Sequence, residues 1–510
     1  MMKSFNRILA AFAALAAVAC AKETSEPYSK FENLALRAWI AQHRPELLDN
    51  YQSFDNDAGY YLDLTDAGNL DTEPINDTIR WIRFSFSGRD LAGNIILTRN
   101  AREAQLAGTF TKYTHYVPYY RYCGESSYSL IEGTWLAMHE KQTLGDAYFA
   151  RYGRDLGLAS KEYEMRIGAK ATLYMPSRVV GTGLSGDGGY EGQYSLDAGK
   201  PLIVTMEICD TIKNPLQREG SSVDSFCEEN GGRLVYSKDE EDEEAVAWPE
   251  TTDDPHHPYI TEQRWVSACD SVAQLYVNYR FNPFEDDALT YPEPYAVGVE
   301  PYTDAESVTS IDVRIAEALK KRFHSDEEYV GVEALEADSV KLNGTAKIWY
   351  IGRFLDGFIF DTNIDEVKEI IYGEVKSAGS ALSYTPENGG LITAFYYAIP
   401  NMQYGQWGAL ITTSTNAYGA SGQSGSTSTS TSGYSNDYYD YLNYLNYYNY
   451  YNSYYGGYYN PYYSGYYDSY YNGYYGSSGS GSTTVTTSTT STEIPSFTPL
   501  IFEFYIEPKK

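Results

Sequence analysis

The chain has 510 residues and a formal net charge of −31, because 38 lysines and arginines stand against 69 aspartates and glutamates. This length exceeds that of one small domain and predicts roughly two to four domains. The negative charge repels phosphate backbones, so we expect no nucleic-acid partner. Tyrosine is concentrated, with 21 of the 53 tyrosines between Tyr434 and Tyr475, and the composition therefore averages two kinds of polymer.

The amino terminus has the pattern of an export signal. Lys3 and Arg7 precede an apolar run from Ile8 to Ala19, which is too short to cross a bilayer and is typical of a signal peptide. The run ends at Ala17-Val18-Ala19-Cys20, which resembles the lipobox of bacterial lipoproteins, including those of Bacteroidota, although Leu is commoner than Ala17 at its position. We therefore expect residues 1–19 to be removed and Cys20 to be lipidated, which anchors the chain in the cell envelope at the outer membrane. The alternative is an ordinary cleavage site beside an unrelated cysteine.

Export would leave four cysteines in an oxidising compartment, where disulfides are permitted. Cys123, Cys209, Cys227 and Cys269 allow three complete pairings, and the sequence does not choose among them. No cysteine pair has a CxxC spacing, and the six histidines supply no partner at zinc-ligand spacing. We therefore expect no metal site and no cofactor.

The predicted elements begin after the cleavage site. Residues 20–54 form a polar tether followed by a helix, and from Trp81 polar and apolar residues alternate as in a strand. Residues 239–244 are six consecutive acids, which predict a solvated linker. Residues 273–280 alternate like a strand that can complete a first sheet, and residues 311–323 have the periodicity of an amphipathic helix.

The last third of the chain contains motifs in a fixed order. Residues 346–363 predict a β-hairpin, because two apolar runs flank an Asp-Gly turn. The motifs are Tyr350-x-Gly352, Asp356-Gly357-x-x-Phe360-Asp361 and Ala417-Tyr418-Gly419. In this order, and with one large interruption, residues 335–508 resemble the FKBP-type peptidyl-prolyl cis-trans isomerases. The segment 364–380, spaced for a helix, has no clear counterpart in that family.

The resemblance implies an α+β fold in which an antiparallel half-barrel sheet wraps a short helix, and it implies a pocket for a prolyl ring. The positions that match the family's catalytic pocket are Tyr350, Phe360, Asp361, Ile392, Phe395, Tyr418 and Phe502. Those that match its substrate-binding positions are Leu391, Ile392 and Tyr418. Phe395 stands where the family usually has a tryptophan floor. The implied partner is a proline-containing polypeptide.

Such a pocket would act without covalent chemistry. Rotation about an X-Pro bond meets a barrier of roughly 18–20 kcal/mol, and a dry aromatic pocket favours the twisted, less dipolar amide. Tyr418 and the Ile392 N–H would hold substrate carbonyls, while Asp361 and Tyr350 supply the other polar contacts. The competing interpretation is that these side chains are ordinary core and that Asp361 caps a turn.

An earlier part of the chain repeats the hairpin. A shift of 264 residues aligns Phe86-Ser87-Gly88-Arg89 with the Tyr350-Arg353 segment, which indicates an internal repeat. Phe86, Ile96 and Leu97 then stand where Tyr350, Phe360 and Asp361 would be. We predict a degenerate FKBP-like domain with little or no isomerase activity at residues 55–210. A connecting region at 211–334 and an FKBP-like isomerase domain at 335–510 follow it.

The tyrosine-rich segment is an insertion in this last domain, at residues 426–492. Its Tyr-Tyr doublets with Asn, Gly, Ser and Thr spacers predict a long disordered loop that contacts glycans or proteins through its rings, or else an idle loop. The sequence favours an exported isomerase that assists folding. The alternatives are a non-catalytic surface lipoprotein that uses FKBP-like folds as binding or adhesive modules, and a structural spacer.

Overall fold

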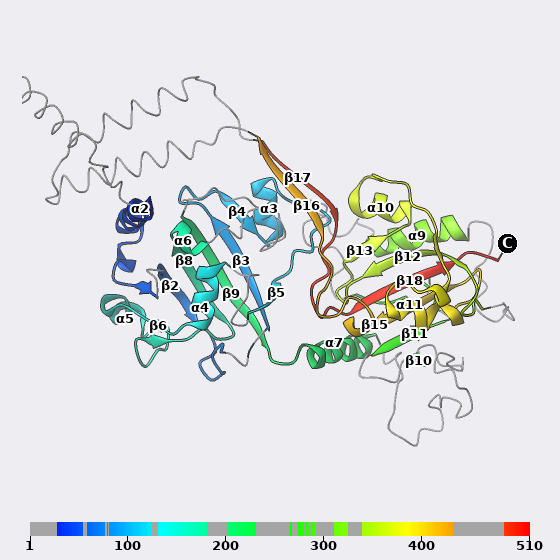
Figure 1. The fold of residues 1–510 in the computed structure, drawn as a ribbon, viewed down its shortest axis with the longest axis horizontal. Coiled ribbons are helices and arrows are strands. Elements are labelled where there is room, and N and C mark those ends of the chain that lie inside the picture. Colours follow the sequence, from blue (N-terminus) through cyan, green and yellow to red (C-terminus); the bar gives the residue numbers. More distant parts are fainter. Residues whose placement is uncertain are drawn as a thin grey trace, which may run out of the picture.

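The computed structural model describes residues 28–54, 59–76, 79, 81–123, 131–180, 201–230, 266–267, 274–279, 281–284, 288–291, 311–324, 339–432 and 484–509. The predicted signal peptide, Cys20, the acidic run at 239–244 and most of the tyrosine-rich insertion lie outside these residues. Two seven-stranded sheets built from antiparallel pairs, each packed with helices, form the described structure (Figure 1). The predicted α+β class is thus confirmed.

The first sheet has the strand order β1-β2-β8-β9-β3-β4, and β5 pairs with β3. Its strands are β1 (Tyr51–Ser53), β2 (Gly59–Ala67), β3 (Trp81–Arg89), β4 (Ile95–Thr98), β5 (Tyr119–Tyr122), β8 (Ala169–Met175) and β9 (Leu202–Ile212). Its helices are α2 (Tyr28–His43), η1 (Pro45–Leu47), α3 (Ala101–Ala107), α4 (Glu132–His139), α5 (Asp146–Tyr152) and α6 (Ser177–Val180). A small ribbon, β6 (Gln142–Thr143) with β7 (Glu162–Tyr163), lies beside them. Burial alternates along β3, as its sequence predicts.

The second sheet has the order β10-β11-β15-β18-β12-β13, and β14 pairs with β12. Its strands are β10 (Val266–Ser267), β11 (Leu275–Asn278), β12 (Ala346–Arg353), β13 (Ile359–Thr362), β14 (Leu382–Tyr384), β15 (Trp407–Thr412) and β18 (Leu500–Ile506). Its helices are α7 (Pro215–Glu229), α9 (Ile311–Phe323), α10 (Asp365–Tyr372), η4 (Pro386–Asn388), α11 (Thr393–Ala398), η5 (Ile399–Asn401) and η6 (Ser414–Asn416). A separate ribbon pairs β16 (Ser426–Ser432) with β17 (Thr484–Ser491). The predicted hairpin and the predicted helices at 311–323 and within 364–380 are all present.

The strand predicted within residues 273–280 belongs to the second sheet and not to the first. As β11 it pairs with β15, with Leu275 opposite Thr412. All four residues of β11 are buried, because the second sheet is covered on both faces. Alternation identified the strand, but it carries no information about which distant strand is the partner. Helix α7 and strands β10 and β11 lie in the region predicted to be connecting, while the predicted domain boundaries stay a prediction.

The two sheets are copies of one arrangement, so the internal repeat is confirmed. Their strand orders correspond element by element, from β1 and β10 at one edge to β4 and β13 at the other. Gly88 pairs with Leu97 in the first sheet, and Gly352 pairs with Asp361 in the second, with a β-bulge directly after each glycine. We call residues 28–212 the first repeat and residues 215–506 the second repeat. Helix α10 corresponds to α3, so the segment without a family counterpart has one inside this chain.

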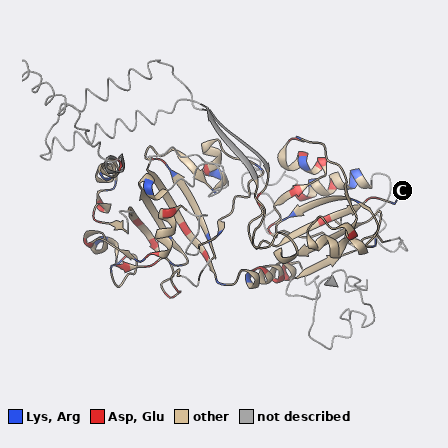
Figure 2. Ribbon diagram, viewed as in Figure 1, with Lys and Arg blue, Asp and Glu red and all other residues tan. Residues whose placement is uncertain are grey.

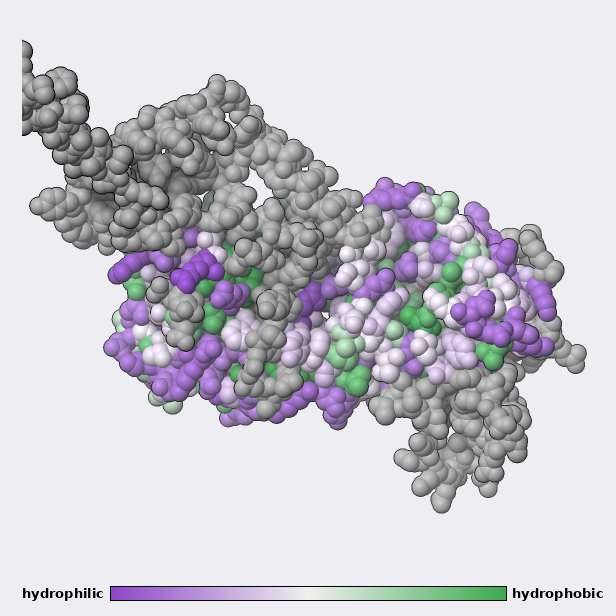
Figure 3. Space-filling model, in the orientation of Figure 1, coloured by the Kyte–Doolittle hydropathy of each residue, from purple (hydrophilic) through white to green (hydrophobic). Residues whose placement is uncertain are grey.

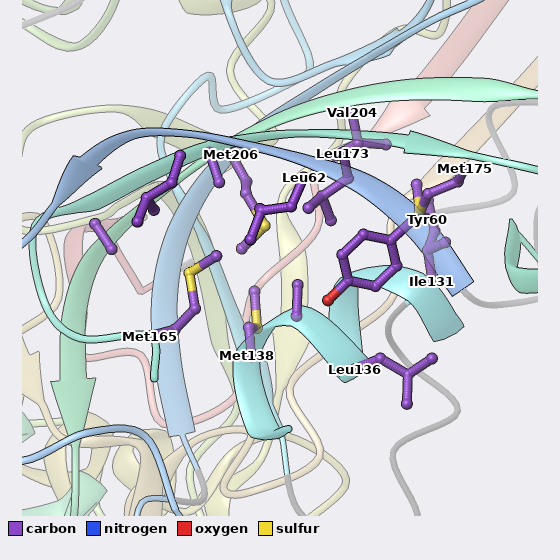
Figure 4. Packing of buried hydrophobic residues seen from close by; sticks show 14 of the residues in the cluster. Tyr60, Leu62, Ile131, Leu136, Met138, Met165, Leu173, Met175, Val204 and Met206 are labelled. Atoms are coloured by element: carbon purple, nitrogen blue, oxygen red, sulfur yellow. The ribbon is translucent and has the colours of Figure 1, made fainter. Parts of the chain in front are cut away.

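Each repeat has its own apolar core. In the first, Tyr60 and Leu62 of β2 and Leu173 of β8 pack with Met138 of the short helix α4 (Figure 4). In the second, α11 fills the corresponding inner face of the sheet, and α9 covers the outer face. Charged residues of both signs lie on α9 and α10 (Figure 2), and the visible surface carries its hydrophobic residues in small separate patches (Figure 3).

Three of the cysteines lie in the described part of the chain, and all three are free thiols. They are Cys123, Cys209 and Cys227. Each complete pairing of the four predicted cysteines requires a disulfide between two of these three, so none of those pairings is formed. Burial raises the pKa of the Cys123 and Cys227 thiols to about 12, which keeps them protonated. Within the described ranges, no helix has both the length and the apolar character needed to cross a bilayer.

Candidate functional site

The hairpin of the second repeat joins Tyr350 of β12 to Asp361 of β13. The Tyr350 hydroxyl donates a hydrogen bond to Oδ2 of Asp361 over 2.7 Å. The bulge after Gly352 fixes this register, since Gly352 lies directly opposite Asp361. The motif residues Tyr350, Gly352 and Asp361 are therefore neighbours because of strand pairing, as the predicted hairpin requires.

Aromatic rings pack edge to face behind this pair. The rings of Phe360 and Phe502 lie 5.6 Å apart at 90°, and those of Phe395 and Phe502 lie 4.9 Å apart at 86°. A Cβ atom on Gly352 would lie 2.7 Å from Cζ of Phe360 and 3.1 Å from Cε1 of Phe502. The glycine of the first motif is thus needed to let the two rings approach the strand.

A cavity of about 460 Å³ has Phe360, one of these rings, in its wall. Phe360, Asp361 and Tyr418 line it together with Tyr372 at the end of α10 and Ile494 after β17. Its volume falls within the range of about 300–1,000 Å³ that is typical of ligand pockets. The cavity has aromatic rings on its wall among many polar and charged side chains, so it can combine ring contacts with hydrogen bonds to an organic ligand.

The predicted site residues divide into two sets. Phe360, Asp361 and Tyr418 line the cavity, whereas Phe395 and Phe502 lie beneath it with only 4% of each residue exposed. The pocket floor is thus covered by the protein's own atoms. Tyr350 and Ile392 pack partly buried against the same core, and neither they nor Leu391 line this cavity. Leu391 is 40% exposed before the start of α11.

The negative charge of Asp361 shapes the ionisation of three surrounding phenols. Burial, and then the charge of Asp361, raises the pKa of Tyr350 and Tyr372 far above the ordinary value. Burial and Asp361 also raise the pKa of Tyr418. All three hydroxyls therefore keep their protons near neutral pH and remain hydrogen-bond donors.

Two donors near the site have no partner among the described residues. They are the hydroxyl of Tyr418 and the backbone N–H of Ile392, the residue that precedes the first turn of α11. Both groups are the predicted holders of substrate carbonyls. Their availability is compatible with that role, since a donor that already bonds within the protein would have to exchange partners.

The loop that carries Tyr418 is positioned from α7, by a residue that sequence reasoning missed. Buried Glu219 accepts hydrogen bonds from the backbone N–H and from Oγ of Ser414, the latter over 2.8 Å. Ser414 then accepts from the N–H of Gly419 over 2.8 Å, where a φ of +59° suits glycine. Glu32 holds Ser177 in the same way in the first repeat. A glutamate on the helix that opens each repeat is the sequence signal that could have revealed this support.

Comparison with known proteins gives similar solved structures only. No protein-family model matches the chain, and no curated protein matches it. A peptidyl-prolyl cis-trans isomerase from Pseudomonas syringae pv. tomato is 16% identical over 38% of this chain and 98% of its own, with a TM-score of 0.21. FkpA from Escherichia coli is 12% identical over 41% of this chain and 72% of its own, with a TM-score of 0.21. The three FKBP domains of wheat FKBP73 are 8% identical over 88% of this chain and 94% of their own, with a TM-score of 0.18.

Proposed function

We propose that the second repeat is a peptidyl-prolyl cis-trans isomerase that acts on proline-containing polypeptides. One observation carries this proposal: Phe360, Asp361 and Tyr418 line one cavity of about 460 Å³, and Tyr350 bonds to Asp361 from outside it. The order of the three sequence motifs supports it, because these are the residues by which the chain resembles the FKBP-type isomerases.

The reaction in this site needs only binding and exclusion of water. The prolyl ring packs against Phe360, and the amide bond that precedes the ring is transferred from water to a position beside an aromatic side chain. The planar amide is more dipolar than the twisted one, so the apolar wall lowers the barrier to rotation. The Tyr418 hydroxyl donates to a substrate carbonyl, and the Tyr350 hydroxyl holds Asp361 in one orientation. No bond to the substrate is formed or broken.

The test is a coupled isomerisation assay on tetrapeptides that contain Leu-Pro or Phe-Pro, with the full chain. We expect a rate above the uncatalysed background, reduced about tenfold or more by Asp361→Ala and several-fold by Tyr418→Phe, since each removes a polar contact of the site. Tyr51→Phe, on the edge strand β1 of the first repeat, is the control and should change nothing. A wild-type rate equal to the background would reject the isomerase proposal.

A second candidate function is a non-catalytic binding or adhesive module. The burial of Phe395 and Phe502, each 4% exposed, favours it, because a prolyl ring would have to displace protein atoms to reach that floor. In this case the chain would bind proline-containing peptides without accelerating their isomerisation. Calorimetric binding measured beside the assay separates the two functions.

We propose further that the protein acts in the cell envelope as a lipoprotein whose lipid is attached to Cys20. Labelled palmitate should enter the wild-type protein and not the Cys20→Ala variant, and incorporation into that variant would overturn the anchor.

For the tyrosine-rich insertion we propose glycan or protein contacts. Deletion of residues 426–492 should then weaken retention on a glycan or unfolded-protein matrix, and unchanged retention would reject the contacts.

A further inference from the structure

A segment of the first repeat reaches the second repeat at the edge of its cavity. This segment, residues 109–118, follows α3, and we call it the crossing segment. The ring of Tyr113 stacks on the ring of Tyr372 with centroids 4.0 Å apart and planes at 14°. His115 Nε2 lies 2.6 Å from Oδ2 of Asp356, and its ring stacks on Phe354 at 4.9 Å. The crossing segment is thus attached both to the end of α10 and to the hairpin turn of the second repeat.

A second attachment comes from the segment that follows β17. Thr492 Oγ1 donates to the backbone carbonyl of Tyr113 over 2.7 Å. Next to it, Glu493 lies between Arg99 and Arg121 of the first repeat, at 2.7 and 2.9 Å. All of these side chains except Thr492 are charged and mostly shielded from solvent, so the contact is stronger than an exposed ion pair. The backbone of Tyr113 is therefore fixed where its ring meets the cavity.

The end of the cavity near Tyr113 is aromatic and carries compensated charge. Tyr113 and Tyr372 both line it, and Nζ of Lys376 lies 5.3 Å from the centre of the Tyr113 ring. Lys376 is 3.4 Å from Glu374, and Lys368 is 3.2 Å from Asp365. Because each lysine has an acidic neighbour, the rings of Tyr113 and Tyr372 are the groups at this end that offer an apolar contact.

We propose that Tyr113 contacts the substrate, so that the site is shared between the repeats, and that the Tyr113–Tyr372 pair selects an aromatic side chain next to the substrate proline. This inference rests on the proposed isomerase function. The prolyl ring lies at the Phe360 and Tyr418 end of the cavity, and the flanking side chain lies at the Tyr113 end. Tyr113 is a specificity-determining residue supplied by a repeat that lacks the site residues itself.

The experiment compares full-length wild type with Tyr113→Ala and Tyr113→Phe. Tetrapeptides that carry Phe or Ala on either side of the proline are assayed for isomerisation, and their affinities are measured by calorimetry. The preference for Phe over Ala should fall about two- to tenfold in Tyr113→Ala, the effect of one lost ring contact, and should persist in Tyr113→Phe.

Two further variants separate contact from docking. His115→Ala removes the bond to Asp356 without altering the cavity lining, and should keep the preference. Tyr51→Ala removes a comparable ring pair elsewhere in the first repeat, since the rings of Tyr51 and Tyr61 lie 4.9 Å apart. This variant should also keep the preference for Phe over Ala. If His115→Ala lowers the preference as much as Tyr113→Ala does, Tyr113 acts through docking and the proposal is overturned.

The wild-type results distinguish this proposal from the function on which it rests. Isomerisation with no preference that depends on Tyr113 would reject the shared site and leave the isomerase in place. Binding with a Tyr113-dependent preference, but without isomerisation, would reject the isomerase and support the shared aromatic wall.

Discussion

The two repeats have the same strand order and the same bulge, yet their central strands are buried differently. Along β9 of the first repeat buried and more exposed positions alternate, whereas every residue of β18 in the second repeat is buried. The difference comes from α9, whose Ile311, Ile315 and Leu319 cover the outer face of the second sheet. The register of the repeat therefore does not depend on this outer layer, and the bulge with the inner core is sufficient to define it.

The same register carries core in one repeat and a cavity in the other. Leu97 is fully buried opposite Gly88, whereas Asp361 is exposed opposite Gly352. Phe86 has no hydroxyl to offer, but Tyr350 bonds to Asp361. A few side chains thus decide whether the hairpin closes on itself or leaves space for a ligand, while the backbone pairing stays the same.

The largest expected effect comes from exchanging the residues at the two equivalent positions, Leu97 and Asp361. Leu97→Asp places a carboxylate without a cation among apolar side chains and should lower the free energy of unfolding by about 3–5 kcal/mol. Asp361→Leu should leave stability nearly unchanged and abolish the proposed isomerase activity. Denaturant titration and the peptide assay measure the two effects. Equal losses of stability in both variants would show that residues 97 and 361 do not lie in a buried and an exposed environment, respectively.

The arginines after the two bulges give the next largest contrast. Arg353 is 4% exposed at its side chain and bonds to Asp312 over 2.8 Å, with Glu503 at 3.7 Å. Arg89 is 37% exposed and bonds to Glu103 over 2.6 Å. Arg353→Met leaves Glu503 buried without its cation and should cost about 3 kcal/mol, against about 0–1 kcal/mol for Arg89→Met. Urea unfolding checks this, and similar losses would contradict the role assigned to the covering helix.

The sequence predicted those elements whose signals are local. The alternation before and after Asp356-Gly357 predicted the hairpin, and pairing within it brought Tyr350 next to Asp361. Periodicity predicted α9 and α10 in the same way. The partner of β11 was not predictable, since its pairing with β15 joins residues far apart in the chain. Nothing local to Tyr113 indicates that its ring reaches a cavity in another repeat.

The junction between the repeats should respond to acid. Burial alone would raise the pKa of Asp356, but the His115 ring and the Phe358 N–H lower it below the ordinary value of about 3.9. A carboxyl group whose pKa is lower in the folded state stabilises the fold at pH values above its unfolded pKa. This contribution disappears as the pH falls through the folded pKa. The Asp356 side chain is 39% exposed, so the effect should stay near or below 1 kcal/mol.

Unfolding curves at several pH values check this junction. The difference between wild type and Asp356→Asn should begin to shrink as the pH falls below the ordinary aspartate pKa, and should vanish below the lowered folded pKa of Asp356. Asp90→Asn, in the corresponding turn of the first repeat, is the matched control, since among the described residues the Asp90 carboxylate bonds to Asn94 of its own turn. A difference that survives in strong acid would mean that the Asp356 charge does not hold the repeats together.

The smallest expected effect concerns the glutamates that support each repeat. Burial raises the pKa of Glu219 and of Glu32, and the hydrogen bonds from Ser414 and Ser177 only partly offset it. A folded pKa above the unfolded value of about 4.3 means that the folded protein binds the proton more tightly, so stability falls as the pH rises from there through the folded value. Glu219→Gln and Glu32→Gln should each reduce this slope and change stability little at pH 4. Glu219→Gln should also alter peptide turnover, because Ser414 bonds to Gly419, next to Tyr418, whereas Ser177 lies in the first repeat. An equal change of turnover in both variants would show that Glu219 does not act on turnover through the Tyr418 loop.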